Sequence, residues 1–175
     1  PGDPIVAWNW NFPGGIPSTS TLQNPVVVYS TAGVHIVTLI ITTQQGYKDT
    51  IVQQVMIYNN PVANFADTAS GCAPVCNVFT DLSNAVDGVI TSWTWSFPGG
   101  MPSSSNQQNP GNVCYNTPGT YGVTLIVTTN YGCKDTLTIN PTINAYPWPT
   151  ANFTYTISGN TLTFNFYPPQ RKAIE

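Results

Sequence analysis

Few residues of this chain could carry out chemistry, and they are scattered along the sequence. The chain has four Cys, one His and seven Asp+Glu, and only 6% of its 175 residues are charged. With a single His, the chain has almost no residues from which to build Ser/His/Asp, Cys/His or multi-His zinc sites. No pair of carboxylates stands near an acid–base partner. We therefore expect no catalytic residues, no metal ligands and no cofactor.

The four cysteines, Cys72, Cys76, Cys114 and Cys133, permit three disulfide pairings. Three residues separate the first two, and 37 and 18 residues separate the following ones. This spacing is a poor match to paired Cys-x2-Cys zinc ligands. Disulfides are typical of secreted proteins, so the cysteines favour an extracellular or cell-surface location.

The low charge also limits the partners that we expect. No basic face is available to neutralise phosphates, which argues against nucleic-acid binding. No apolar run approaches the roughly 18 residues of a membrane helix, so we expect no membrane insertion. The polar residues are mainly Thr, Ser, Asn and Gln, and they accompany 14 Gly and 16 Pro. These residue types favour strands and turns, so the composition predicts an all-β protein.

Two long stretches of the chain repeat each other. AWNWNFPGGIPS (7–18) matches SWTWSFPGGMPS (92–103) at an offset of 85 residues. VTLIITT (37–43) then matches VTLIVTT (123–129) at an offset of 86. Internal similarity at a fixed period is the signature of repeated modules.

A weaker repeat relates PVANF (61–65) to PTANF (149–153) at an offset of 88. We therefore expect a complete copy at 60–146. The first copy, 1–59, lacks its first two strands, and the third, 147–175, holds only the opening hairpin. This arrangement fits either a segment of a longer tandem array or a subunit whose ends complete each other between chains.

Period-2 alternation of apolar residues predicts short strands throughout the complete copy. About seven strands in 85–88 residues fit a sandwich of two sheets. The third copy reads as a hairpin that turns at 158–160, with Leu162, Phe164 and Phe166 on one face. The expected strands of the complete copy cover residues 63–65, 74–79, 91–97, 112–116, 121–129 and 134–144.

The repeated pattern W-x-W-x-F-P-G-G-x-P-S, followed by N-P, G-x-Y-x-V-T-L and G-x-x-D-T, resembles the PKD (polycystic kidney disease) domain. The match is to the variant frequent in secreted and surface proteins of Bacteroidetes-type bacteria. The resemblance implies immunoglobulin-like β-sandwiches in tandem, one complete copy flanked by two incomplete copies, without catalysis. The family's acidic W-D-F-G-D-G motif is replaced here by W-N-F-P-G-G and W-S-F-P-G-G, so we expect no calcium site.

The aromatic residues of the repeated motif share one face of their strands. Buried aromatics dominate sandwich interiors, which predicts that this face lies in the core. A sugar-stacking platform is the alternative for the Trp pairs. Trp148 lies between two prolines, and we expect it to pack at the junction between copies. The predicted core residues of the motif are Trp8, Trp10, Phe12, Trp93, Trp95 and Phe97.

The lone histidine, His35, aligns with Tyr121 of the complete copy. Tyr121 follows a glycine at the start of a strand, as does the tyrosine of a tyrosine corner, whose hydroxyl bonds to nearby backbone. We expect His35 to make the equivalent structural bond. The alternative, a pH switch or a ligand, lacks partner residues.

The implied fold selects among the disulfide pairings. The strands of Cys76 and Cys114 are neighbours in it, and both cysteines are out of phase with inward residues such as Phe79 and Val113. This predicts a Cys76–Cys114 disulfide. Cys72 and Cys133 fall in turns at opposite ends of the module, which predicts links between successive modules or subunits.

Asp-Thr precedes an apolar or small residue at Thr50, Thr68 and Thr136. This resembles the Bacteroidetes O-glycosylation motif, and the three threonines are candidate sites. The alternative is that Asp-Thr only begins the last strand of each copy.

We expect a non-catalytic extracellular structural or adhesive repeat module of a bacterial surface or secreted protein, acting as a stalk or protein-interaction spacer. One alternative is a self-assembling filament subunit, in which the C-terminal hairpin completes the N-terminal domain of the next chain. Another is a carbohydrate-binding accessory module of a secreted hydrolase, with Tyr131, Tyr146 and Trp148 as exposed aromatics. The expected partners are neighbouring PKD-like modules or copies of the chain, with glycans and other surface proteins as further candidates.

Overall fold

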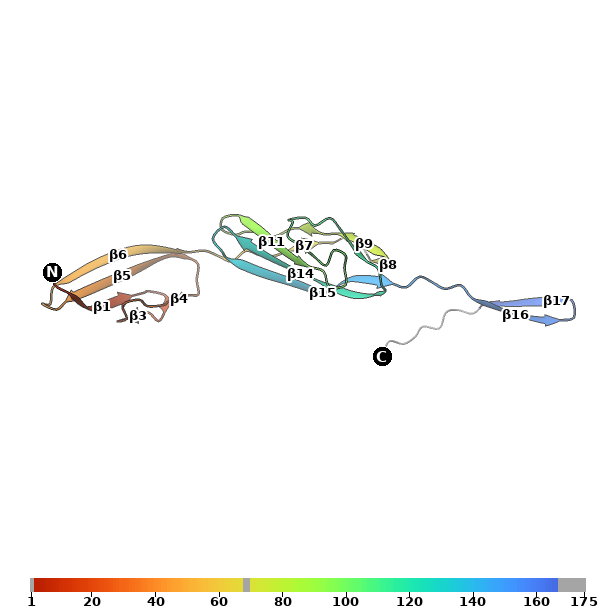
Figure 1. The fold of residues 1–175 in the computed structure, drawn as a ribbon, viewed down its shortest axis with the longest axis horizontal. Coiled ribbons are helices and arrows are strands. Elements are labelled where there is room, and N and C mark those ends of the chain that lie inside the picture. Colours follow the sequence, from red (N-terminus) through yellow and green to blue (C-terminus); the bar gives the residue numbers. More distant parts are fainter. Residues whose placement is uncertain (1, 68–69, 167–175) are drawn as a thin grey trace. The chain divides into compact units, whose positions relative to one another are not determined.

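The computed structural model describes residues 2–67 and 70–166, and the regular elements of these residues are all β-strands (Figure 1). The chain divides into two compact units. One contains Pro1–Asn64, Leu82–Trp93 and Ile126–Leu137, and the other contains the remaining segments. These borders divide individual strands and do not follow the repeat, so the boundaries at 59/60 and 146/147 stay a prediction.

The N-terminal sheet has four antiparallel strands in the order β3-β1-β5-β6. Trp10 of β1 lies opposite Leu39 of β5, which lies opposite Ile51 of β6. Opposed residues share a face of a sheet, so these three side chains point the same way. The strands are β1 (Ile5–Asn11), β3 (Thr19–Ser20), β5 (Gly33–Thr43) and β6 (Lys48–Ile57), with a separate pair β2 (Gly15–Ile16) and β4 (Val28–Tyr29).

The central sandwich consists of β7 to β15. Its larger sheet has the order β12-β11-β14-β15-β8, and two short pairs, β10-β7 and β13-β9, complete it. The larger sheet contains β8 (Gly71–Cys72), β11 (Ile90–Ser96), β12 (Ser104–Ser105), β14 (Gly119–Thr129) and β15 (Lys134–Tyr146). The short pairs are β7 (Phe65–Ala66) with β10 (Thr80–Asp81), and β9 (Val75–Val78) with β13 (Asn112–Tyr115).

The core of the central sandwich follows the period-2 pattern of its strands. Along β14, Val123, Leu125 and Val127 are fully buried, whereas the residues between them are half-buried. Alternation places successive side chains on opposite faces, so one face of β14 lines the interior. The largest fully buried side chains are Trp95, Tyr115, Phe79, Phe97, Leu125, Ile143 and Val113.

The C-terminal hairpin pairs β16 (Phe153–Ser158) with β17 (Thr161–Phe166) around Gly159-Asn160. Gly159 has a φ of 58°, which a tight hairpin turn requires. Phe153 lies opposite Phe166, and Tyr155 lies opposite Phe164. All twelve strand residues of the hairpin are exposed.

Three strand predictions differ from the structure. The strand expected at 63–65 is only Phe65–Ala66. The strand expected at 74–79 is divided, because β9 pairs with β13 whereas β10 pairs with β7. The buried side chains nevertheless keep their alternation through Val75, Asn77 and Phe79, so periodicity alone does not reveal the change of partner. The last strand extends to Tyr146, because its end pairs in parallel with β8.

Candidate functional site

The repeated aromatic motif has the same local geometry in both copies. The rings of Trp10 and Phe12 stack with centroids 5.6 Å apart, and those of Trp95 and Phe97 stack at 5.8 Å. Each inner tryptophan donates its indole N–H to a backbone carbonyl at 3.0 Å, from Trp10 to Leu22 and from Trp95 to residue 107. These contacts are local, so the strand and the loop that follows it are sufficient to position the rings.

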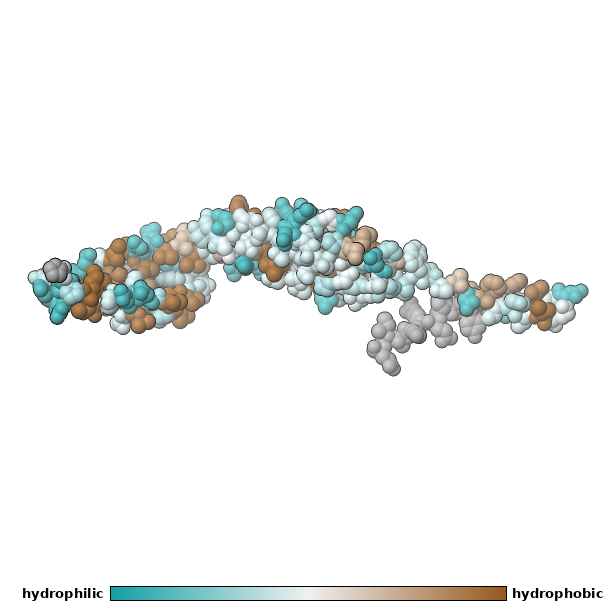
Figure 2. Space-filling model, in the orientation of Figure 1, coloured by the Kyte–Doolittle hydropathy of each residue, from teal (hydrophilic) through white to brown (hydrophobic). Residues whose placement is uncertain are grey.

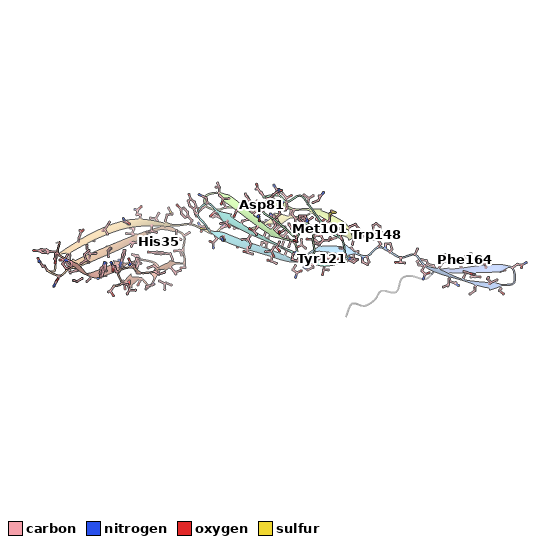
Figure 3. All side chains as sticks on the ribbon, in the orientation of Figure 1. His35, Asp81, Met101, Tyr121, Trp148 and Phe164 are labelled. Atoms are coloured by element: carbon pink, nitrogen blue, oxygen red, sulfur yellow. A yellow bond between two sulfur atoms is a disulfide. The ribbon has the colours of Figure 1, made fainter. Side chains whose placement is uncertain are left out.

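The tyrosine corner is present in the central sandwich, and His35 takes its place in the N-terminal copy. Tyr121 and His35 are both labelled in Figure 3. The Tyr121 hydroxyl donates to the Thr117 carbonyl at 2.8 Å. His35 Nε2 bonds the Thr31 carbonyl at 2.9 Å, four residues upstream in each case. The prediction of a structural hydrogen bond for His35 is therefore confirmed.

The Pro-Gly-Gly turn brings its middle glycine close to this corner. Gly99 has a φ of 78°, and a Cβ at this position would overlap the ring of Tyr121. Gly14 has a φ of 80° in the other copy, and its Cβ would lie 3.6 Å from His35. Backbone conformation thus requires glycine at both positions, and the closer approach in the central sandwich is due to the larger tyrosine ring.

The aromatic residues of the two copies of the motif differ in how far they are buried. Trp95 and Phe97 are fully buried and Phe12 is 5% exposed, as predicted for the core. Trp8, Trp10 and Trp93, which were also predicted as core residues, are only half-buried. For Trp10 the reason is that the described residues of the N-terminal copy supply no strand pair equivalent to β7 and β10.

The central sandwich contains the disulfide between Cys76 and Cys114 that the strand phases predict. The two residues lie opposite each other in the β9–β13 pair, and Val75 and Val113 beside them point into the core. The bond joins the two strands on the side of the pair that faces away from the core. It closes a loop with a sequence separation of 38 residues.

Cys72 and Cys133 are free thiols, each half-buried. Cys72 lies in β8 beside Tyr146, at the end of β15, and not in a turn as expected. The chain gains parallel pairing with β15 there, which the turn-like sequence around it does not indicate. Cys133 immediately precedes Lys134, the first residue of β15. The two thiols therefore lie at opposite ends of one strand, and a link between them across two modules or subunits stays a prediction.

The segment that follows β6 is tied to loops of the central sandwich by side-chain contacts. The Asn59 backbone N–H and Nδ2 both donate to Asp87 Oδ2, at 2.7 and 3.0 Å. The rings of Tyr58 and Tyr131 stack in parallel with centroids 3.6 Å apart, and Cys133 Sγ contacts the Tyr58 carbonyl. Burial raises the pKa of Tyr58, and Tyr131 beside it raises it further.

These connecting residues were missed by the sequence reasoning, which treated them only as the end of the first copy. The sequence contains one indication of their role. Tyr58 recurs as Tyr146 at the offset of 88 residues that also relates PVANF (61–65) to PTANF (149–153). Asp87 gave no signal, since its role depends on a contact 28 positions away in sequence.

The candidate glycosylation residues Thr50 and Thr136 are exposed on β6 and β15. Thr68 lies outside the described residues. Asp135, which precedes Thr136, accepts a hydrogen bond from the Ala63 backbone N–H at 2.8 Å. This contact gives the Asp-Thr pair of the central sandwich a structural role, and modification of the threonines stays a prediction.

The candidate sugar-binding aromatics Tyr131, Tyr146 and Trp148 are all exposed, and Tyr131 stacks on Tyr58. Sugar binding by these residues stays a prediction. Trp148 is 68% exposed, so its expected packing between copies is absent among the described residues. Within residues 2–67 and 70–166, no three His, Cys, Asp or Glu side chains gather as metal ligands would. No helix of the described part is long and apolar enough to cross a membrane.

Comparison with known proteins identifies the middle of the chain. A family model described as "PKD domain" matches residues 58–144. The search of curated proteins gives no match.

Several solved structures resemble the chain, and three of them are described below. The PKD1 domain of Vibrio anguillarum Epp is 28% identical and covers 50% of this chain and 96% of that domain, with a TM-score of 0.43. The PKD1 domain of the Vibrio cholerae metalloprotease PrtV is 31% identical and covers 50% and 99%, also with a TM-score of 0.43. Fibronectin(III)-like modules of Clostridium thermocellum CbhA are 10% identical over 84% of this chain and 81% of that chain, with a TM-score of 0.43.

The family match begins at Tyr58, so it includes the connecting residues Tyr58 and Asn59. The match also includes both free cysteines, the disulfide and the tyrosine corner. Residues 58–144 of this chain form a domain of the PKD family.

Proposed function

We propose that the chain is a non-catalytic structural module of a secreted or cell-surface protein, which acts as a stalk or protein-interaction spacer. PKD domains are commonly extracellular structural or interaction modules. The disulfide of the central sandwich supports an oxidising, extracellular location.

The observation that carries this proposal is the structured connection at Tyr58 and Asn59. A free linker has few side-chain contacts and lets modules move independently. Here one carboxylate, Asp87, accepts two hydrogen bonds from Asn59, and two tyrosine rings stack. Because β6 ends at Ile57, directly before these held residues, no free linker separates the N-terminal sheet from the central sandwich, and a spacer needs such a connection.

Small-angle X-ray scattering of the whole chain tests the proposal. We expect one narrow distribution of maximum dimension for the wild type. The double variant Asp87→Ala/Tyr131→Ala removes both sets of contacts and should broaden that distribution. Tyr47→Ala is a matched control, because Tyr47 is a 69% exposed tyrosine close to a turn of the first copy. Equally broad distributions for wild type and double variant would contradict the spacer role.

A second candidate, a self-assembling filament subunit, is favoured by a separate observation. Figure 2 shows hydrophobic surface over the N-terminal sheet and on the C-terminal hairpin, whereas the visible surface of the central sandwich is mostly hydrophilic or intermediate. Large apolar patches are unusual on monomeric proteins and mark interaction sites.

A further inference from the structure

One face of the N-terminal sheet contains a shallow apolar hollow. Its volume is about 250 Å³, and five side chains from three adjacent strands line it. Ile51 in this hollow is 51% exposed. We call this surface the open face, and its lining residues are Trp10, Val37, Leu39, Ile51 and Gln53.

The same positions are closed in the central sandwich. Val123 and Leu125, which the repeat aligns with Val37 and Leu39, are fully buried, and so is Trp95. The rings of Phe65 and Phe79 cover this tryptophan, with centroids 5.4 and 6.0 Å from it. In the central sandwich, aromatic side chains of a second pair of strands therefore cover the face that is open in the N-terminal sheet.

The C-terminal hairpin carries a matching apolar face. Directly opposed residues lie on the same side of a hairpin, so its two faces differ completely in chemistry. The six residues of the apolar face are 52–70% exposed. The other face contains only Thr, Ser and Asn. The apolar face consists of Phe153, Tyr155, Ile157, Leu162, Phe164 and Phe166.

The ring geometry of the hairpin reproduces that of the covering strands. Phe65 and Phe79 meet edge to face, with centroids 6.1 Å apart and an interplanar angle of 68°. Phe153 and Phe164 meet in the same way, at 5.7 Å and 63°. Phe153 is also the repeat equivalent of Phe65. Phe164 is the labelled residue of the hairpin in Figure 3.

We propose that the apolar face of the hairpin docks on the open face of a second copy of this chain, with Phe153 and Phe164 over Trp10. The proposal rests on the filament candidate above and assigns its interface. Each chain then offers one hairpin and one open face. Such a heterologous contact joins chains head to tail and leaves both outer ends free for further copies.

The hairpin and the N-terminal sheet are attached at opposite ends of one strand. The connection at Tyr58 contacts Tyr131 and Cys133, just before β15 begins. The hairpin follows Tyr146, where β15 ends. A strand of 13 residues spans about 40 Å. We therefore take a second copy as the occupant of the open face, and docking on the chain's own sheet, which would leave the chain monomeric, is the outcome that the sedimentation experiment below distinguishes.

The size and charge of the two faces suit a protein–protein interface. Each large apolar side chain of the hairpin exposes on the order of 100 Å², so docking would bury roughly 1,200 Å² over both partners, the lower limit of stable interfaces. The hairpin strands contain no charged residue, and the lining of the open face contains none either. Docking therefore removes no charge from water.

Sedimentation velocity of the whole chain from about 1 to 100 μM tests the proposal, because this range covers the weak association expected at the small end of stable interfaces. We expect the wild type to form species that grow with concentration. Phe164→Asp should weaken this association at least tenfold, because it places a charge in the interface. Thr163→Asp is the matched control on the polar face of the same hairpin and should associate as the wild type does. Trp fluorescence should shift to the blue on association, since Trp10 becomes covered.

Mixing two variants identifies the pair of surfaces. Ile51→Asp damages the open face and keeps the hairpin, whereas Phe164→Asp does the reverse. Each alone should be monomeric, and their mixture should stop at a one-to-one heterodimer. Val52→Asp, on the other side of β6 where Val52 is 60% exposed, should behave as the wild type.

Two outcomes would overturn the docking. A wild-type chain that stays monomeric over the whole concentration range has no such interface, although a narrow scattering distribution would still support the spacer role. Dimers that persist unchanged in Phe164→Asp would mean that two open faces cover each other. Growth with concentration that Phe164→Asp abolishes, together with the heterodimer, supports the assignment.

Discussion

The central sandwich and the N-terminal sheet contain the same aromatic motif in two different environments. Trp95 and Trp10 each stack on a phenylalanine and each donate an indole hydrogen bond 12 residues downstream. Yet Trp95 is fully buried, whereas Trp10 is half-buried. The geometry of the motif is therefore set within the strand and its loop, and its burial depends on a separate pair of strands.

This difference separates two contributions to stability that usually occur together. Local hydrogen bonds and ring stacking are present in both copies, and each contributes modestly. Enclosure by Phe65 and Phe79 is present in one copy only. Equivalent substitutions in the two copies therefore measure the contribution of enclosure.

The largest expected effect is that of Trp95→Ala compared with Trp10→Ala. Removing the fully buried Trp95 leaves a large cavity and should cost about 3–5 kcal/mol of unfolding free energy. Trp10→Ala should cost less than about half of that in the monomeric chain, because the ring already contacts water. Native-state hydrogen exchange of amides in β14 and β5 measures the two effects separately. Equal losses would mean that the open face is covered in solution.

The disulfide gives the next effect, and it belongs to the central sandwich alone. Closing a loop of 38 residues restricts the unfolded chain and contributes about 3–4 kcal/mol. Cys76→Ser/Cys114→Ser should lower the denaturant midpoint of the central sandwich and leave the N-terminal sheet unchanged. Cys72→Ser/Cys133→Ser is the control and should retain most of the stability. A central sandwich that loses nothing on removal of the bond would argue that its unfolded state is already compact.

The corner residues give a smaller effect. Tyr121→Phe removes the hydrogen bond to the Thr117 carbonyl and should cost about 1 kcal/mol. His35→Tyr should change the unfolding free energy little, because a tyrosine hydroxyl at this position can donate to the Thr31 carbonyl that His35 now bonds. Thermal unfolding of the two variants gives the comparison. A large loss for His35→Tyr would show that Gly14 and its neighbours have adapted to the smaller ring.

Sequence patterns predicted what depends on local chemistry. The all-β class, the strands of the motif, the His35 bond and the Cys76–Cys114 pair all follow from alternation, spacing and family resemblance. The change of partner within 74–79, the parallel pairing of Cys72 and the exposure of Trp10 were missed. Each of these depends on which strand lies alongside, and a period-2 pattern contains no information about that.

The connection at Tyr58 was missed for a related reason. Its contacts join positions 28 and more residues apart, and the atoms involved, a carboxylate and two amide donors, are common on any loop. Only the recurrence of tyrosine at 58 and 146 pointed to it. Residues that join repeats are therefore harder to predict than residues that form them.

The smallest expected effect appears at high pH and concerns the central sandwich alone. Burial raises the pKa of Tyr115 to about 12, with Tyr121 adding to the rise, and no described side chain bonds its hydroxyl. A group whose pKa is higher in the folded state contributes stability below its unfolded pKa of about 10 and loses it above. The central sandwich should therefore lose stability between pH 10 and 12. Tyr115→Phe should lessen that loss, because the other tyrosines titrate equally in both proteins. Denaturant unfolding of the wild type and Tyr115→Phe at pH 9 and pH 11.5 measures this effect. The same difference in unfolding free energy between the two proteins at both pH values would contradict the prediction.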